Sequence, residues 1–312
     1  MIRRPIYNFE FPLRCSEVSL FEYRFVRVQN YEQQLQRLQH LNNVHKEFNI
    51  TANTGEHAIT AYVNLPEKEH GAALEWAGNG NTALMDVLLL LSLFTGRDVF
   101  AGEPGDENSH TMNTGVLNRD SRVYRFGGSL SASISYKPKT IGEGVVQNVG
   151  FEEELNRIYL LIRSKEWQEK YRGGYFLFLA RQAFHCQTLE ASFIQSWTIW
   201  EHLFAIFNQS WLSKRQIHDL SSAEKISFLL VEYALRDEID DTSRSRIAGL
   251  AEIRNRLIHF GRFPDRDKVH DDAVLFIRLT EFILTKILGL SPSNVFDTME
   301  KLEKYLRERN KA

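Results

Sequence analysis

Arg254, Asn255 and His259 lie within six residues of one another near the end of a long predicted helix. A histidine side chain can give or take a proton near neutral pH. An arginine guanidinium carries a permanent positive charge and binds phosphate groups through a planar set of donors. A phosphate-binding arginine beside a proton-transferring histidine could cleave a phosphodiester bond, and we take these three residues as the catalytic candidates.

The helix that carries these residues is predicted over 243–259, from apolar residues that recur at helical spacing. At about 100° per residue, one broad apolar face contains Ile247, Leu250, Ala251, Ile253, Leu257 and Ile258. Arg254 falls within this face, whereas Asn255 and His259 align along its flank. An arginine in an apolar stripe is costly unless it meets a partner or a ligand. A buried ion pair and a side chain that extends to solvent are the structural alternatives to phosphate binding.

The same segment is rich in positive charge. Five arginines and a single acid, Glu252, occur between Arg244 and Arg262, although the whole chain has a formal net charge of −2. A local basic patch in a slightly acidic protein fits a polyanion such as RNA, and Arg256 and Arg262 are the predicted RNA contacts. The alternative is a helix face that is simply solvated.

The motif from Arg254 to His259 resembles the Arg-Asn-x-x-x-His signature of HEPN domains. These helical domains occur in many prokaryotic toxin and antiviral-defence ribonucleases. The apolar run from Phe193 to Phe204, which contains Glu201, is similar to the helix that often lies upstream of the signature in this family. The resemblance covers residues 150–310, about half of the chain, and leaves residues 1–150 without an assigned motif.

The resemblance implies a homodimeric endoribonuclease that cuts single-stranded RNA by attack of the ribose 2′-hydroxyl, without a metal ion or other cofactor. Arg254 would stabilise the charge that develops on the phosphate, and Asn255 would orient it through hydrogen bonds. Arg254 and His259 are about 140° apart on one helix, so two chains would have to combine them at a shared cleft. Glu201 would hold Arg254 in place, with an unrelated salt bridge as the equal alternative.

A role in antiviral defence or in toxin-type growth arrest would follow from such an activity. Two other functions remain open. The helical part could be a non-catalytic HEPN-like module that binds RNA or a protein partner. It could also be a structural scaffold in which Arg254 is an ion-paired core residue, and in that case its replacement would unfold the protein.

Residues 1–150 and 151–312 are predicted to form two domains of an α+β protein. The first mixes strands at 21–28, 58–65 and within 122–136 with helices at 31–48 and 82–95, and a loop is expected at 101–120. We expect it to sense a trigger or to restrain cutting, through a regulatory partner or an activating ligand. The second is expected to be an all-α, HEPN-like bundle, with helices at 151–169, 173–185, 188–209, 221–235, 243–259, 268–288 and 293–310.

The composition favours a cytoplasmic protein that does not contact membranes. Two widely spaced cysteines, Cys15 and Cys186, support neither a disulfide framework nor a zinc cluster, and no metal-binding set is recognised. No signal peptide is recognised, and the longest apolar run, at 87–94, is far shorter than the ~20 residues that span a bilayer. Trp197, Trp200, Phe204 and Phe207 recur at helical spacing, which predicts a core or a dimer interface rather than base stacking.

Overall fold

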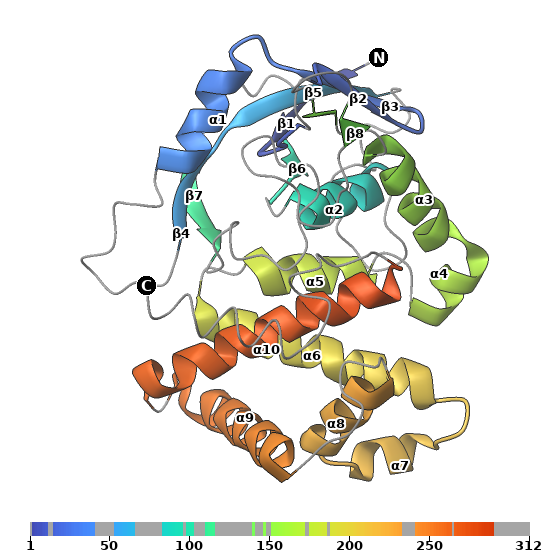
Figure 1. Ribbon diagram of the computed structural model, residues 1–312, viewed down its shortest axis with the longest axis vertical. Coiled ribbons are helices and arrows are strands. Elements are labelled where there is room, and N and C mark those ends of the chain that lie inside the picture. Colours follow the sequence, from blue (N-terminus) through green and yellow to red (C-terminus); the bar gives the residue numbers. More distant parts are fainter. Residues whose placement is uncertain are drawn as a thin grey trace.

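The structure is a computed structural model with a sheet at one end of the molecule and helices at the other (Figure 1). It describes residues 2–11, 15–40, 53–65, 83–95, 98–102, 110–115, 139–140, 146–147, 151–171, 175–185, 188–232, 241–263 and 265–289. We refer to the described residues before 150 as the sheet half and to those after 150 as the helical half. The protein is therefore α+β, as the sequence predicts.

The sheet half is built on five antiparallel strands in the order β2-β3-β5-β1-β6. Their bounds are β1 Ile2–Tyr7, β2 Glu17–Leu20, β3 Tyr23–Arg27, β5 Ile59–Leu65 and β6 Phe100–Ala101. Side chains alternate along β3, where Tyr23 and Phe25 are buried while Arg24 and Val26 are exposed. One face of the sheet therefore contributes to the core.

Two strand pairs and two helices complete the sheet half. The pairs join β4 (Asn53–His57) with β7 (His110–Gly115), and β8 (Lys139–Thr140) with β9 (Val146–Gln147). Helix α1 spans Tyr31–His40 and α2 spans Ala83–Thr95. Helix α2 is buried along almost its whole length, as expected from its leucine-rich sequence.

The sequence predicts these elements only in part. The strands expected at 21–28 and 58–65 are confirmed as β3 and β5, and the helices expected at 31–48 and 82–95 begin at Tyr31 and Ala83. The prediction of a loop at 101–120 is wrong for His110–Gly115, which form strand β7. This segment is polar and lacks the alternation of a strand, and it becomes a strand because it pairs with β4. The strands expected within 122–136, and the continuation of α1 over 41–48, lie outside the described residues.

The helical half contains eight described helices. Their bounds are α3 Phe151–Arg163, α4 Lys165–Tyr171, α5 Tyr175–His185, α6 Leu189–Asn208, α7 Lys214–Asp219, α8 Ser222–Glu232, α9 Asp241–Phe260 and α10 Arg266–Ile287. The helices predicted between 151 and 288 are confirmed, with two differences: the first is divided at Ser164, and α7 was not expected. The Ser164 hydroxyl accepts a hydrogen bond from the Trp167 N–H at 3.2 Å and so begins α4 as a separate helix. The helix expected at 293–310 lies outside the described residues.

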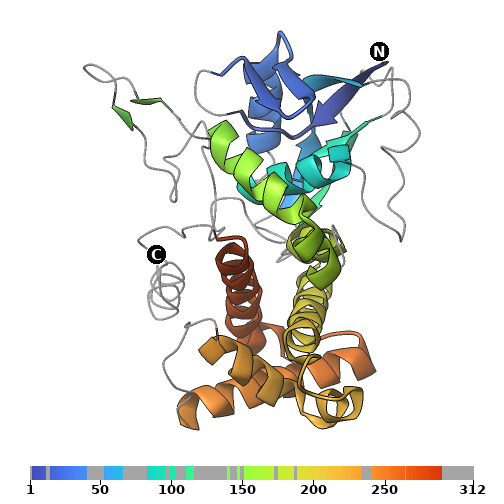
Figure 2. The same cartoon turned by 90° about the vertical axis from the view of Figure 1, so that its right-hand side faces the viewer.

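Helices α6 and α10 cross the middle of the molecule, and α7, α8 and α9 form the end farthest from the sheet (Figures 1 and 2). Trp197, Trp200 and Phe204 are buried, and the rings of Trp197 and Trp200 pack on Phe276 of α10. The Trp200 indole N–H donates to the Thr280 hydroxyl at 2.8 Å. The aromatic repeat of α6 is therefore core, as predicted. No described helix is long and apolar enough to cross a membrane.

Two ion pairs connect the sheet half with the helical half. Asp86 of α2 is almost fully buried and lies 3.1 Å from the guanidinium of Arg163 at the end of α3. Asp98, just before β6, pairs with Arg181 of α5. Helix α2 also packs on α5, and the buried apolar side chains of both halves form one continuous cluster. The two predicted domains therefore share a core and polar contacts.

The Asp98 pair should make folding stability depend on acid pH. Burial on its own raises the pKa of Asp98, but the nearby charges of Arg181 and His185, together with the Arg181 hydrogen bond, outweigh it and hold this pKa below the usual carboxyl range. A carboxylate with a lowered pKa in the folded state stabilises the fold at pH values above the ordinary carboxyl pKa. This stabilisation is lost as the pH falls through the lowered pKa. Asp98→Asn should thus reduce the free energy of unfolding by about 1–3 kcal/mol at pH 7.

Urea denaturation between pH 2 and pH 7 checks this expectation. The difference between the wild type and Asp98→Asn should shrink below about pH 4. The matched control is Asp219→Asn on α7, an aspartate whose side chain is 63% exposed and whose replacement should have little effect. A difference that stays constant down to pH 2 would show that the Asp98 charge does not stabilise the fold.

Candidate active site

Helix α9 places the predicted motif at the end of the molecule farthest from the sheet (Figure 1). The helix packs on α8, α6 and α10. It ends at Phe260 because Gly261 adopts a left-handed conformation with φ of 70°, and the Gly261 N–H donates to the Leu257 carbonyl at 2.8 Å. The motif therefore occupies the last two turns of the helix.

The buried face of α9 is narrower than the sequence predicts. Ile247, Leu250 and Leu257 are buried, in agreement with the helical wheel. Ile258, which the wheel places in the same face, is 53% exposed. It lies at the edge of the apolar face nearest Asn255, and the face that packs on the other helices is centred on Leu250 and Leu257.

Arg254 is half-buried and lies beside Asn255 on the surface of α9. Its guanidinium Nη1 donates a hydrogen bond to the Asn255 side-chain oxygen at 3.0 Å. In the described part of the chain, this amide is the partner of Arg254, and no carboxylate forms a salt bridge with it. No described carboxylate compensates the positive charge of the guanidinium, and a neutral amide fixes its direction. This arrangement is suited to an anionic ligand.

Asn255 and His259 are both exposed, one helical turn apart. Within the described ranges, no hydrogen-bonding partner holds the His259 ring. An imidazole in this position is accessible to a substrate. The structure therefore brings Arg254 and Asn255 into contact and places His259 on the neighbouring turn, at the helix end.

Glu201 on α6 has different partners from the one expected. One carboxylate oxygen accepts a hydrogen bond from the Ser222 hydroxyl, and the other lies 3.0 Å from the Lys225 ammonium. Burial raises the pKa of Glu201, but these contacts outweigh burial and lower it overall. Lys225 is buried and needs a counter-charge, so Glu201 joins α6 to α8 and does not contact Arg254.

The arginines around the motif divide into paired and unpaired groups. Arg246 forms a half-buried pair with Asp272 of α10 at 2.7 Å, and Arg256 lies 3.4 Å from Glu252 in an exposed pair that holds it weakly. Arg244 and Arg262 are exposed and form no salt bridge with a described residue. Arg262, just after the motif, keeps a positive charge that favours a polyanion, whereas Arg244 lies three residues from the exposed Asp241 in the first turn of α9.

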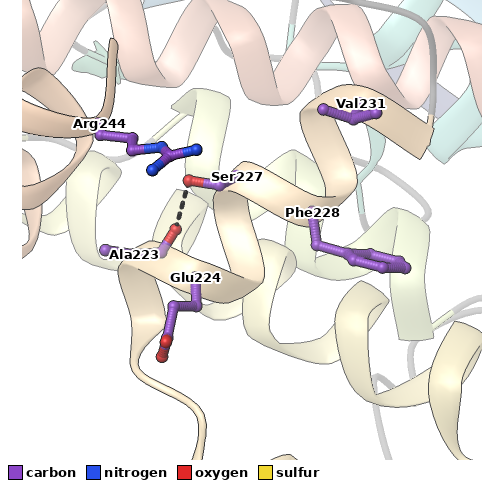
Figure 3. Close-up of a pocket in the computed structure, with 6 residues that line it drawn as sticks. All are labelled: Ala223, Glu224, Ser227, Phe228, Val231 and Arg244. Carbon is purple, nitrogen blue, oxygen red and sulfur yellow. Dashed lines mark hydrogen bonds between the residues drawn. The ribbon is translucent and has the colours of Figure 1, made fainter. Parts of the chain in front are cut away.

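A pocket that the sequence analysis did not identify lies between α8 and the start of α9 (Figure 3). Its volume is about 590 Å³. The described residues that line it are Ala223, Glu224, Ser227, Phe228, Val231 and Arg244. In the sequence, the apolar pair Phe228 and Val231, three residues apart, could have pointed to this pocket. In the structure these two residues remain 43% and 44% exposed on α8.

No group of His, Cys, Asp and Glu with the geometry of a metal site occurs among the described residues. No protein-family model, no curated protein and no solved structure significantly matches the chain.

Proposed function

We propose that the helical half is a HEPN-like endoribonuclease that cuts single-stranded RNA without a metal ion. The observation that carries the proposal is the charge-bearing guanidinium of Arg254, oriented by Asn255, one turn from the solvent-accessible imidazole of His259. A scaffold arginine would be expected to pair with a carboxylate, and Arg254 forms no such pair within the described residues. A role in antiviral defence or in toxin-type growth arrest is part of the proposal.

In the proposed reaction, the 2′-oxygen of a ribose attacks the adjacent phosphorus while a histidine removes its proton. The bond from phosphorus to the 5′-oxygen of the next nucleotide breaks, and this oxygen takes up a proton. The products are a 2′,3′-cyclic phosphate and a 5′-hydroxyl end. Arg254 stabilises the extra negative charge on the phosphoryl oxygens as the attacking bond forms.

The proposed active site is shared between two copies of the chain. Arg254 and His259 are about 140° apart around α9, so one helix aims them in different directions. The last turn of α9 also exposes two large apolar side chains, Ile258 and Phe260, at 53% and 73%. A second α9, related by a two-fold axis, would cover these side chains and bring its own His259 toward Arg254.

Cleavage assays in EDTA test the proposal. The full-length protein should cut a labelled single-stranded RNA with EDTA present and leave cyclic phosphate ends. An RNA of the same sequence with one 2′-deoxyribose at the cut position should resist cleavage at that bond, because the attacking oxygen is missing. Cleavage that requires a divalent metal, or that proceeds at the deoxyribose position, would contradict the mechanism.

The second candidate function is a non-catalytic module that binds RNA or a protein partner. The exposed Ile258 and Phe260 favour it, because apolar side chains in the last turn of a basic helix can serve assembly alone. Tight RNA binding by a homodimer that leaves the RNA intact under all of these conditions would support this alternative. In both cases, the sheet half is the proposed site for a regulatory partner or an activating ligand.

A further inference from the structure

We propose that the pocket between α8 and α9 binds one nucleotide of the RNA substrate, with the base against Phe228 and the phosphate toward Arg244. The inference rests on the proposed function, since it assigns a second contact to the same RNA. The pocket of about 590 Å³ spans the outer face of α8, with Arg244 on one side and the Phe228 ring on the other (Figure 3). It is distinct from the motif at the other end of α9.

The aromatic side of the pocket is suited to stacking. Phe228 is 43% exposed as a residue, and Phe204 supports its ring from the core in an edge-to-face contact with ring centroids 5.7 Å apart. Trp211, in the turn that follows α6, is 62% exposed and lies 6.4 Å from Phe228 between ring centroids. Two neighbouring aromatic rings with solvent-exposed surface are a platform for unpaired bases.

The polar side of the pocket is suited to a phosphate and a ribose. Arg244 is exposed and has no acidic partner among the described residues. The Ser227 hydroxyl donates to the Ala223 carbonyl at 2.9 Å, which leaves its oxygen able to accept a hydrogen bond from a ligand. The pocket therefore offers a positive charge and an acceptor beside an apolar wall.

Among the described residues that line the pocket, the one carboxylate, Glu224, does not neutralise Arg244. Glu224 points away from Arg244 and Ser227 (Figure 3). One of its carboxylate oxygens accepts the Ser221 N–H at 2.7 Å, as a residue in the first turn of a helix commonly does. Hydrogen bonds with Ser221 lower the pKa of Glu224, so it remains ionised and bound to the start of α8. Arg244 is therefore the cation that the described lining offers to a ligand on the α9 side.

Arg244 of the pocket and two residues of the motif lie along one exposed strip of α9, whereas Arg254 lies about 80° to one side of Arg244. Arg244, Asn255 and His259 fall within about 60° of one another around the helix. Ala248 and Ala251 lie between them, and their small side chains leave the strip open to a polymer. The distance along the axis is about 16–22 Å at ~1.5 Å per residue, or roughly five to seven nucleotides of a stacked strand at ~3.4 Å each. One RNA strand could therefore reach both sites.

Abasic scanning of the RNA tests the inference. The full-length protein carries His259→Ala to prevent cleavage, and its affinity is measured by fluorescence anisotropy with a labelled 16-nucleotide single-stranded RNA. A single abasic residue, about five to seven nucleotides from the bond that the active protein cuts, should weaken binding about tenfold. The same abasic RNA should lose no further affinity when His259→Ala is combined with Phe228→Leu, because the stacking partner is already altered.

Two further variants separate the parts of the pocket. Trp211→Ala should weaken binding to the intact RNA about tenfold. Arg244→Gln should weaken binding at every RNA sequence and reduce its salt dependence by about one phosphate contact. The matched controls are Tyr175→Leu on α5, which is 48% exposed, and Arg24→Gln on the sheet, and both should bind RNA like the parent.

The outcomes distinguish this inference from the proposed function. An abasic position that costs the same affinity with and without Phe228→Leu would show that the pocket holds no base. Dissociation of the dimer by Phe228→Leu, measured by sedimentation, with unchanged RNA affinity per dimer would assign the pocket to a second copy of the chain. RNA binding that depends on the pocket residues, without cleavage in EDTA, would overturn the proposed ribonuclease activity and support the nucleotide-binding pocket. Cleavage at an unchanged rate in all pocket variants would overturn the pocket inference and support the ribonuclease. An absence of RNA binding would overturn both the pocket inference and the ribonuclease.

Discussion

Replacing His259 with alanine should lower the rate of RNA cleavage in EDTA at least a hundredfold. Proton transfer by a positioned side chain contributes about 10²- to 10⁴-fold to such reactions, and His259 is the exposed imidazole of the motif. The fold should be unaffected, because removal of an exposed side chain with no described hydrogen-bonding partner changes stability by about 0.5 kcal/mol or less.

The matched control is His218→Ala. His218 is an exposed histidine on α7, in the same half of the molecule, and its replacement should leave the cleavage rate unchanged. Initial rates with a labelled RNA, measured beside thermal unfolding of each variant, provide the readout. A His259→Ala protein that cuts at the rate of the wild type would remove the histidine from the mechanism.

Mixing two inactive variants should restore cleavage. With the proposed shared site, Arg254→Ala and His259→Ala should each lose activity as a homodimer, because each composite site would lack one of the two groups. A mixed dimer has one site that takes Arg254 from one chain and His259 from the other. After random exchange of subunits in equal amounts, about a quarter of the wild-type activity should return, since half of the dimers are mixed and half of their sites are intact.

The recovery separates two arrangements of the active site. If Arg254 and His259 acted within one chain, no mixed dimer would contain an intact site and no activity would return. The control is an equal mixture of wild type with the double variant Arg254→Ala/His259→Ala. In a composite site, its mixed dimers are inactive, so random exchange should halve the activity of the wild-type chains. Absence of recovery despite proven subunit exchange would refute the shared site.

The periodic helices of the second half could be predicted from sequence, because their positions depend mainly on apolar spacing. The α9 pattern identified Ile247, Leu250 and Leu257 as buried and placed the end of the helix at 259; the structure confirms their burial and ends the helix one residue later, at Phe260. The strands β1, β2, β4, β6, β7, β8 and β9 were missed. Their sequences are short or polar. β1, β4, β6 and β7 pair with strands that are distant in the chain, whereas β2 pairs with the neighbouring β3 and β8 with the neighbouring β9.

The candidate site was predictable in its residues and less so in its contacts. The spacing of Arg254, Asn255 and His259 is a property of one helix, so it could be worked out from the sequence. The partners of Glu201 could not, because they depend on how α8 packs against α6 and on the buried charge of Lys225. The pocket was missed for a similar reason, since Arg244 and Phe228 belong to helices whose relative position is a tertiary property.

The position of α5 has a consequence for control of the molecule. This helix packs on α2 and, on another side, on α6, which in turn packs on α8 and α9. Arg181 fastens α5 to Asp98 beside β6. A ligand that binds only the folded sheet would therefore stabilise the helices by thermodynamic linkage, because the two halves share buried surface. An effector would not need to touch the motif to alter how tightly α9 is held.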